Sequence, residues 1–193
     1  LVREGALQRA IAPPGALLDR LGGSDAVTFT GSADTAAKLK ANQNLIREAV
    51  PFTAEADSLN CAILAPDVTP DDPEFDLFVK EVAREMTGKA GQKCTAIRRV
   101  IVPEQHADAV GARLRERLAR ITVGNPKVEG VRMGALASMD QHRDVSERVE
   151  MLARGNEVLF SARDGFNPVG EGVTAGAFFA PTLLLCRNAS SND

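Results

Sequence analysis

Short apolar runs with the character of buried strands alternate along this sequence with amphipathic segments of helical period. We expect strands near residues 26–29, 61–64, 97–102, 156–161 and 178–185, and helices near residues 33–41, 75–86, 107–121 and 141–152. Strands and helices that alternate in this way are typical of an α/β protein with crossover connections.

Two of the expected helices have recognisable start signals. Residues 69–74, of sequence Thr-Pro-Asp-Asp-Pro-Glu, offer capping and acidic side chains ahead of an apolar stripe from Phe75 to Met86. Ser138 and Gln141 have the spacing of a capping box. The Gly-rich residues 164–176 are expected to form a loop.

The composition limits the class of protein. With 44% hydrophobic and 25% charged residues, the chain resembles an ordinary soluble globular protein. No apolar run reaches the roughly 18 residues of a membrane helix, and no secretory signal is visible. A formal net charge of -3 argues against a nucleic-acid partner, which usually requires a basic face.

The three cysteines, Cys61, Cys94 and Cys186, are odd in number and widely spaced. This pattern suits neither a disulfide framework nor a zinc site, so a reducing cytoplasm is the expected compartment. Cys61 falls inside an expected strand and Cys186 at the end of another. Free cysteines in such places are usually buried and inert, and we expect both to be buried.

Cys94 has a different setting, because residues 91–95, of sequence Gly-Gln-Lys-Cys-Thr, lie between an expected helix and an expected strand. Loops held by rigid elements commonly carry reactive groups, and a neighbouring cation such as Lys93 favours a thiolate. On this segment alone, a buried inert cysteine is the commoner alternative. The hypothesis is a nucleophilic Cys94 that solvent can reach.

Glu55 lies in residues 52–58, a segment expected to precede a strand, and has alanines on both sides. A carboxyl group among small residues could be partly buried, with a raised pKa that suits a general base. A solvated loop glutamate is the commoner alternative for such a segment.

Residues 29–32, of sequence Phe-Thr-Gly-Ser, read as the end of a strand, a tight turn and a helix start. Free backbone N–H groups at a helix start can bind a phosphate, and Gly31 lets the backbone approach it closely. Ser32 as a plain N-cap is the commoner alternative.

The two histidines, His106 and His142, fall near the starts of expected helices on polar faces. We expect both to be solvated and to bind no metal, since neither has other ligands nearby.

Taken in order, these segments resemble the aldehyde dehydrogenase superfamily over almost the whole chain. The resemblance rests on Thr30-Gly31-Ser32, on Glu55, on residues 91–96, on Gly124-Asn125-Pro126 and on Pro181-Thr182. It departs after Glu55, where the family's usual Leu-Gly-Gly-Lys is replaced by Ala-Asp-Ser-Leu-Asn, and the interval to Cys94 is a little longer. Residues 51–63 and 82–103 look like one branch, the dehydrogenase domain of bifunctional ring-opening proteins in bacterial phenylacetate degradation.

The resemblance implies an aldehyde dehydrogenase fold and NAD(P)-dependent oxidation of an aldehyde, in that branch a CoA-linked semialdehyde. It assigns Cys94 as the nucleophile and Glu55 as the general base for hydrolysis of the thioester. It places Thr30, Gly31 and Ser32 beside NAD or NADP, and implies that the parent protein is a homo-oligomer.

The same resemblance implies a fragment, with residues 1–54 as the end of the Rossmann-like NAD(P)-binding domain and residues 55–193 as most of the catalytic domain. We expect the isolated chain to be inactive. A cysteine-dependent acyltransferase or hydrolase is an alternative, although it would require a histidine partner. A non-catalytic structural fragment is the other alternative.

Overall fold

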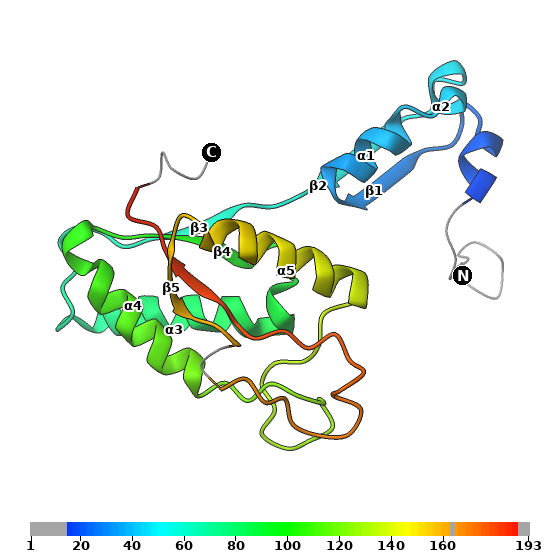
Figure 1. The fold of residues 1–193 in the computed structure, drawn as a ribbon. Coiled ribbons are helices and arrows are strands. Elements are labelled where there is room, and N and C mark those ends of the chain that lie inside the picture. Colours follow the sequence, from blue (N-terminus) through cyan, green and yellow to red (C-terminus); the bar gives the residue numbers. More distant parts are fainter. Residues whose placement is uncertain (1–14, 163–164, 189–193) are drawn as a thin grey trace. The chain divides into compact units, whose positions relative to one another are not determined.

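The structure, a computed structural model, describes residues 15–162 and 165–188 (Figure 1). The chain separates between Ser58 and Leu59 into two compact units. The separation falls after β2 (Phe52–Ala56), so Glu55 belongs to the first unit. Each unit is described by itself.

The first unit is built on two parallel strands, β1 (Val27–Gly31) and β2. The connection between them contains α1 (Ala33–Lys40) and α2 (Gln43–Arg47), and a 3-10 helix, η1 (Gly15–Arg20), precedes β1. The register pairs Thr30 with Glu55 and Gly31 with Ala56. Because the strands are parallel, their carboxyl ends lie at the same edge.

A polar side chain helps to hold this small unit together. Asn44 is buried, and its Nδ2 donates to the carbonyl oxygens of Leu18 at 2.9 Å and Leu21 at 2.7 Å. Few apolar side chains of the unit are buried among the described residues, namely Ala36, Leu45 and Val50. Hydrogen bonds of Asn44 therefore fix η1 on α2 where apolar packing is sparse.

The second unit begins with a second parallel pair, β3 (Asn60–Ile63) and β4 (Ile97–Ile101). The crossover between them is α3 (Pro73–Thr87), followed by a short 3-10 segment, η2 (Gly88–Gly91). Three further elements follow β4 before the last strand: α4 (Glu104–Ala119), α5 (Met139–Ala153) and β5 (Glu157–Phe160). β6 (Leu183–Leu185) pairs with β5 in antiparallel fashion.

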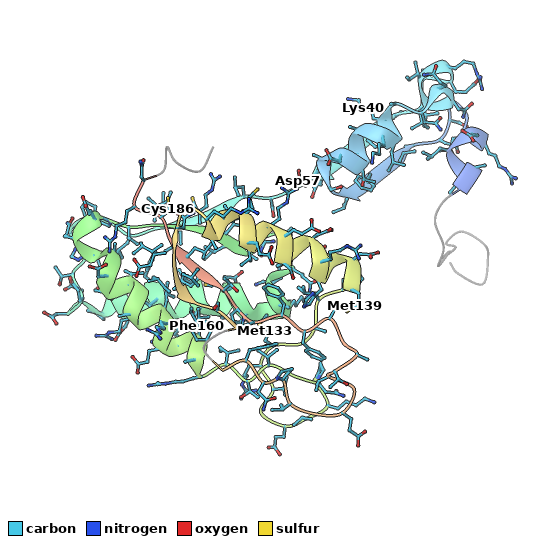
Figure 2. The ribbon with its side chains drawn as sticks, in the orientation of Figure 1. Lys40, Asp57, Met133, Met139, Phe160 and Cys186 are labelled. Carbon is cyan, nitrogen blue, oxygen red and sulfur yellow. The ribbon has the colours of Figure 1, made fainter. Side chains whose placement is uncertain are left out.

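The core of the second unit lies where α3 and α4 pack against each other and against the strands (Figure 1). Its side chains come from both helices and two strand regions: Leu64, Phe75, Val79, Val82, Ala83, Val110, Leu114, Leu118 and Phe160, the last labelled in Figure 2. Just before α3, the Thr69 N–H and hydroxyl donate to the Asp72 carboxylate and lower its pKa. Asp72 is the N-cap residue of α3, but its side chain makes no capping hydrogen bond to the helix.

The sheet of β3 and β4 is covered on one face only among the described residues. Ala62, Ile97 and Val100 pack against the core, whereas the paired Ile63 and Ile101 are exposed. Among the described residues, no helix is long and apolar enough to cross a membrane.

The α/β class and most of the expected elements are confirmed within a few residues. Three segments differ. The 52–56 segment, which was expected only to precede a strand, is itself the strand β2, and α2 was not expected at all. The strand expected over 178–185 is limited to Leu183–Leu185, since Pro181 lacks the N–H that a ladder requires.

Candidate functional site

Cys94 lies on a short turn between η2 and β4, and its side chain is exposed. The turn is closed by a hydrogen bond of 3.1 Å from the Ala96 N–H to the Lys93 carbonyl oxygen. This agrees with the prediction that Cys94 is solvent-reachable on a turn.

The backbone just before this turn is strained. Lys89, Ala90 and Gly91 have consecutive positive φ angles of 52°, 55° and 69°. A non-glycine residue in this left-handed region costs about 1–2 kcal/mol, so surrounding contacts must hold the conformation. Such strain is concentrated at functional sites.

Gln92 fastens the strained segment to a distant part of the second unit. Its Oε1 accepts from the Ala137 N–H at 2.8 Å, and its Nε2 donates to the carbonyl oxygens of Lys89 at 3.0 Å and Ala135 at 3.4 Å. These bonds attach the backbone before Cys94 to the segment around Ala137, which is more than forty residues away along the chain.

Two further side chains hold the turn by its carbonyl groups. Nδ2 of Asn60, the first residue of β3, donates to the carbonyl oxygen of Cys94 at 2.6 Å. The Arg98 guanidinium donates to the carbonyl oxygens of Gly91 at 2.5 Å and Lys93 at 3.5 Å.

Lys93 does not have the role expected for it. Its Nζ lies 2.7 Å from Oε1 of Glu85 on α3, and both side chains are largely buried. The ammonium therefore anchors the turn to α3 and is not a free cation beside the Cys94 thiol. The second Glu85 oxygen, Oε2, is buried with no hydrogen-bond partner among the described residues.

The expectation that Cys61 and Cys186 are buried is wrong, because both are exposed. Cys61 pairs with Arg99 in the β3–β4 sheet, one face of which is uncovered among the described residues. Cys186 directly follows β6 and is labelled in Figure 2. Of the three cysteines, Cys94 alone lies on a turn between two elements of secondary structure.

In the first unit, the structure brings Thr30 and Glu55 together as direct neighbours on β1 and β2, with Gly31 opposite Ala56. Ser32 follows β1 as the N-cap of α1. The Glu55 side chain is exposed in this unit, which agrees with the commoner alternative of a solvated glutamate and not with partial burial. Among the described residues, β2 belongs to a sheet of only two strands, so few neighbours cover this side chain.

The start of α1 is already engaged by two side chains. Ser32 Oγ accepts from the Thr35 N–H at 3.2 Å, which confirms the N-cap. Asp57, at a φ of 57°, accepts from the Ala33 N–H through Oδ1 at 3.2 Å. A phosphate at this helix start would have to displace the Asp57 carboxylate. In the sequence, the only signal of Asp57 is its position two residues after Glu55.

The two histidines are half-buried against aromatic rings, not solvated as expected. His106 meets the edge of Phe75 at a centroid distance of 6.4 Å, and His142 meets Phe179 at 5.3 Å. Among the described residues, no group of three potential metal ligands was found.

The second unit has a pocket of about 210 Å³, whose described lining does not include Cys94 or the side chains that hold its turn. It is formed by the end of α4, by β5 and by two loops, and its lining includes Leu118, Ile121, Phe160, Phe166, Ala180 and Pro181. Among the residues that the structure describes, its lining contains no cysteine and no charged side chain.

Comparison with known proteins defines the family. The model of the aldehyde dehydrogenase family matches residues 15–192, so the chain belongs to that family. It is 45% identical over 190 residues to 3,4-dehydroadipyl-CoA semialdehyde dehydrogenase of Aromatoleum evansii, a match that covers 93% of this chain and 37% of the relative.

Solved structures show the same fold. A variant of betaine aldehyde dehydrogenase from Staphylococcus aureus without cofactor is 25% identical, with a TM-score of 0.73 over 88% of this chain and 33% of that chain. The same enzyme in complex with NAD+ gives a TM-score of 0.70 at 25% identity, over 83% of this chain and 30% of that chain. Aldehyde dehydrogenase C of Pseudomonas syringae, in complex with NAD+ and octanal, is 23% identical, with a TM-score of 0.69 over 83% of this chain and 31% of that chain. The chain thus spans about a third of the length of these relatives.

Proposed function

We propose that this chain is the cysteine-bearing part of a longer NAD(P)-dependent aldehyde dehydrogenase, with Cys94 as nucleophile and Glu55 as general base. The observation that carries the proposal is the Cys94 turn. An exposed thiol follows a strained backbone that Gln92, Arg98 and Asn60 hold in place. An inert surface cysteine does not require such support.

In the proposed reaction, the Cys94 thiolate attacks the aldehyde carbon and forms a C–S bond, while the carbonyl π electrons move to oxygen. The Cys94 N–H stabilises the resulting oxyanion. When bound, the nicotinamide cofactor supplies the hydride acceptor that converts this adduct to a thioester. Glu55 then takes a proton from water, whose oxygen attacks the thioester carbon and releases the Cys94 thiolate and the carboxylic acid.

Thr30, Gly31 and Ser32 are the residues that would contact NAD or NADP. They lie at the carboxyl edge of a parallel strand–helix–strand unit, which is where nucleotides bind in open α/β sheets. The position fits a cofactor lying along the strand edge. It fits less well a phosphate at the very start of α1, where Asp57 holds the Ala33 N–H.

The proposed substrate is a CoA-linked semialdehyde of the phenylacetate or a related aromatic degradation route. The support is the 45% identity to 3,4-dehydroadipyl-CoA semialdehyde dehydrogenase. We further propose that residues 1–54 end the cofactor-binding domain and residues 55–193 begin the catalytic domain of a homo-oligomeric cytoplasmic protein. Neither nucleic acid nor membrane has a role in this proposal.

The test is aldehyde-dependent reduction of NAD+ and NADP+ by the full-length protein, with 3,4-dehydroadipyl-CoA semialdehyde and octanal as substrates. We expect the CoA-linked aldehyde to have the higher kcat/KM, and Cys94→Ala to abolish turnover of both. A Cys94→Ala protein that still oxidises either aldehyde would refute the assignment of the nucleophile.

A further inference from the structure

Both peptide groups that flank the Cys94 Cα are held by their carbonyl oxygens. The Lys93 carbonyl oxygen accepts from the Ala96 N–H at 3.1 Å and from Arg98 at 3.5 Å. The Cys94 carbonyl oxygen accepts from Asn60 at 2.6 Å. The two peptide planes of the nucleophile are therefore fixed by different partners.

Among the residues that the structure describes, the N–H groups of these same two peptides have no protein acceptor. No cis peptide bond occurs in the described chain, so the N–H groups of Cys94 and Thr95 point away from the held carbonyl oxygens. Within residues 15–162 and 165–188, neither N–H has a hydrogen-bond acceptor, and both residues are exposed. Two consecutive donors at a nucleophile can together bind a developing negative charge.

A local irregularity of the sheet places the two side chains that hold these peptides. Asn60 pairs with Ile97, but the next residue, Cys61, pairs with Arg99, so Arg98 is an extra residue in β4. A bulge of this kind redirects a side chain, and bulges are frequent beside active sites. Here the extra residue directs its guanidinium to the carbonyl oxygens of Gly91 and Lys93.

We propose that Asn60 and Arg98 are positioning residues that hold the Lys93–Cys94 and Cys94–Thr95 peptides, so that the N–H groups of Cys94 and Thr95 both bind the oxyanion formed at the substrate carbonyl. This inference rests on the proposed function. It adds Thr95 as a second backbone donor and gives the bulge at Arg98 a role. Asn60 and Arg98 themselves do not contact the reacting atoms.

The variants are Asn60→Ala and Arg98→Met in the full-length protein, with Asn156→Ala and Arg120→Met as matched controls. Asn156 donates to the Leu152 carbonyl oxygen at 2.7 Å, and Arg120 forms an exposed pair with Glu116, so each control loses a similar contact away from the turn. Single-turnover mixing with NAD+ and octanal, and with NAD+ and 3,4-dehydroadipyl-CoA semialdehyde, gives two quantities. The burst amplitude counts competent sites, and its rate constant reports hydride transfer.

We expect the burst rate constant to fall about tenfold to a hundredfold in Asn60→Ala and Arg98→Met. Removing one oxyanion donor costs about 10²–10³ in rate. The effect here should be smaller, because both N–H groups remain and only their orientation is no longer fixed. NAD+ affinity and burst amplitude should stay within twofold, and Arg98→Lys should recover part of the rate. The controls should match the unmodified protein. A smaller amplitude at an unchanged rate constant would mean that the residues only support folding, and would overturn the inference.

A second measurement does not depend on aldehyde turnover. Free backbone N–H groups also stabilise a thiolate, so iodoacetamide should modify Cys94 severalfold more slowly at pH 7 in the two variants than in the controls. Unchanged alkylation and burst rates, together with an inactive Cys94→Ala, would overturn the positioning role alone. Aldehyde oxidation that survives Cys94→Ala would instead refute the proposed function.

Discussion

The ammonium of Lys93 and the carboxylate of Glu85 form an ion pair of 2.7 Å that ties the residue before Cys94 to α3. The Lys93 side chain is 29% exposed and that of Glu85 is 15% exposed, so water screens the pair only in part. The pair anchors the turn that carries the thiol.

Lys93→Met should lower the unfolding free energy by about 1–3 kcal/mol, because it leaves the largely buried Glu85 carboxylate with only the more distant Arg84, at 3.8 Å, as a cation. Adding Glu85→Gln should recover part of the loss, since the uncompensated charge is then removed. Urea unfolding followed by circular dichroism measures both effects. Arg143→Met is the control, because the Arg143–Asp140 pair is exposed and screened by water, so its loss should change the unfolding free energy little. Equal losses in both single variants would contradict the anchoring role.

Gly91→Ala should destabilise the protein by about 1–2 kcal/mol or more and lower its activity. Gly91 has a φ of 69°, and an added Cβ would lie 3.1 Å from the Met86 carbonyl oxygen. Gly130→Ala is a matched control, since Gly130 has a φ of 85° but an added Cβ would meet nothing within 4 Å. Thermal unfolding and the steady-state rate should separate the two variants. If both variants lose the same stability and activity, the contact between an added Cβ at position 91 and the Met86 carbonyl oxygen does not matter.

Glu55→Gln in the full-length protein should slow hydrolysis of the thioester more than hydride transfer, because activation of water belongs to the second step. Rapid mixing should then show a normal burst of NAD(P)H followed by a slow steady state. Thr53→Val on the same strand is a control for disturbance of β2. A burst that falls in proportion to the steady state would argue against the base assignment.

Alkylation of the chain under native conditions should reach all three thiols, because Cys61, Cys94 and Cys186 are all exposed. Cys94 should be modified first, since free N–H groups adjoin it. Peptide mapping at increasing times determines the order. Modification of Cys61 or Cys186 ahead of Cys94 would contradict this expectation.

The isolated 193-residue chain should bind NAD+ and NADP+ weakly and show no dehydrogenase activity. It offers one helix start at a strand edge, where Ser32 and Asp57 already engage two N–H groups. One or two remaining hydrogen bonds, at about 1–3 kcal/mol in total, fall well short of the roughly 8 kcal/mol of a micromolar site. Calorimetric titration is the measurement, and a micromolar Kd for either nucleotide would show that the cofactor contacts are misplaced.

The sequence by itself determined the elements whose signals are local. The apolar stripe from Phe75 to Met86 predicted α3, and Ser32 and Ser138 predicted helix starts that the structure confirms through hydrogen bonds to Thr35 and Gln141. The order of the segments around Thr30, Glu55 and Cys94 likewise indicated the aldehyde dehydrogenase family. Periodicity and capping act within a few residues, so they can be recognised in one sequence.

Only the tertiary structure decided the strand β2, the role of Lys93 and the contacts that hold the Cys94 turn. β2 consists of residues such as Ala54 and Glu55 with little intrinsic preference for a strand, and pairing with β1 imposes the conformation. Lys93 is an anchor because α3 brings Glu85 to it, and Asn60 and Arg98 reach the Cys94 turn because β3 and β4 pair with a shifted register. Partners such as Asn60 and Cys94 are 34 residues apart, and no local pattern encodes a contact over that separation.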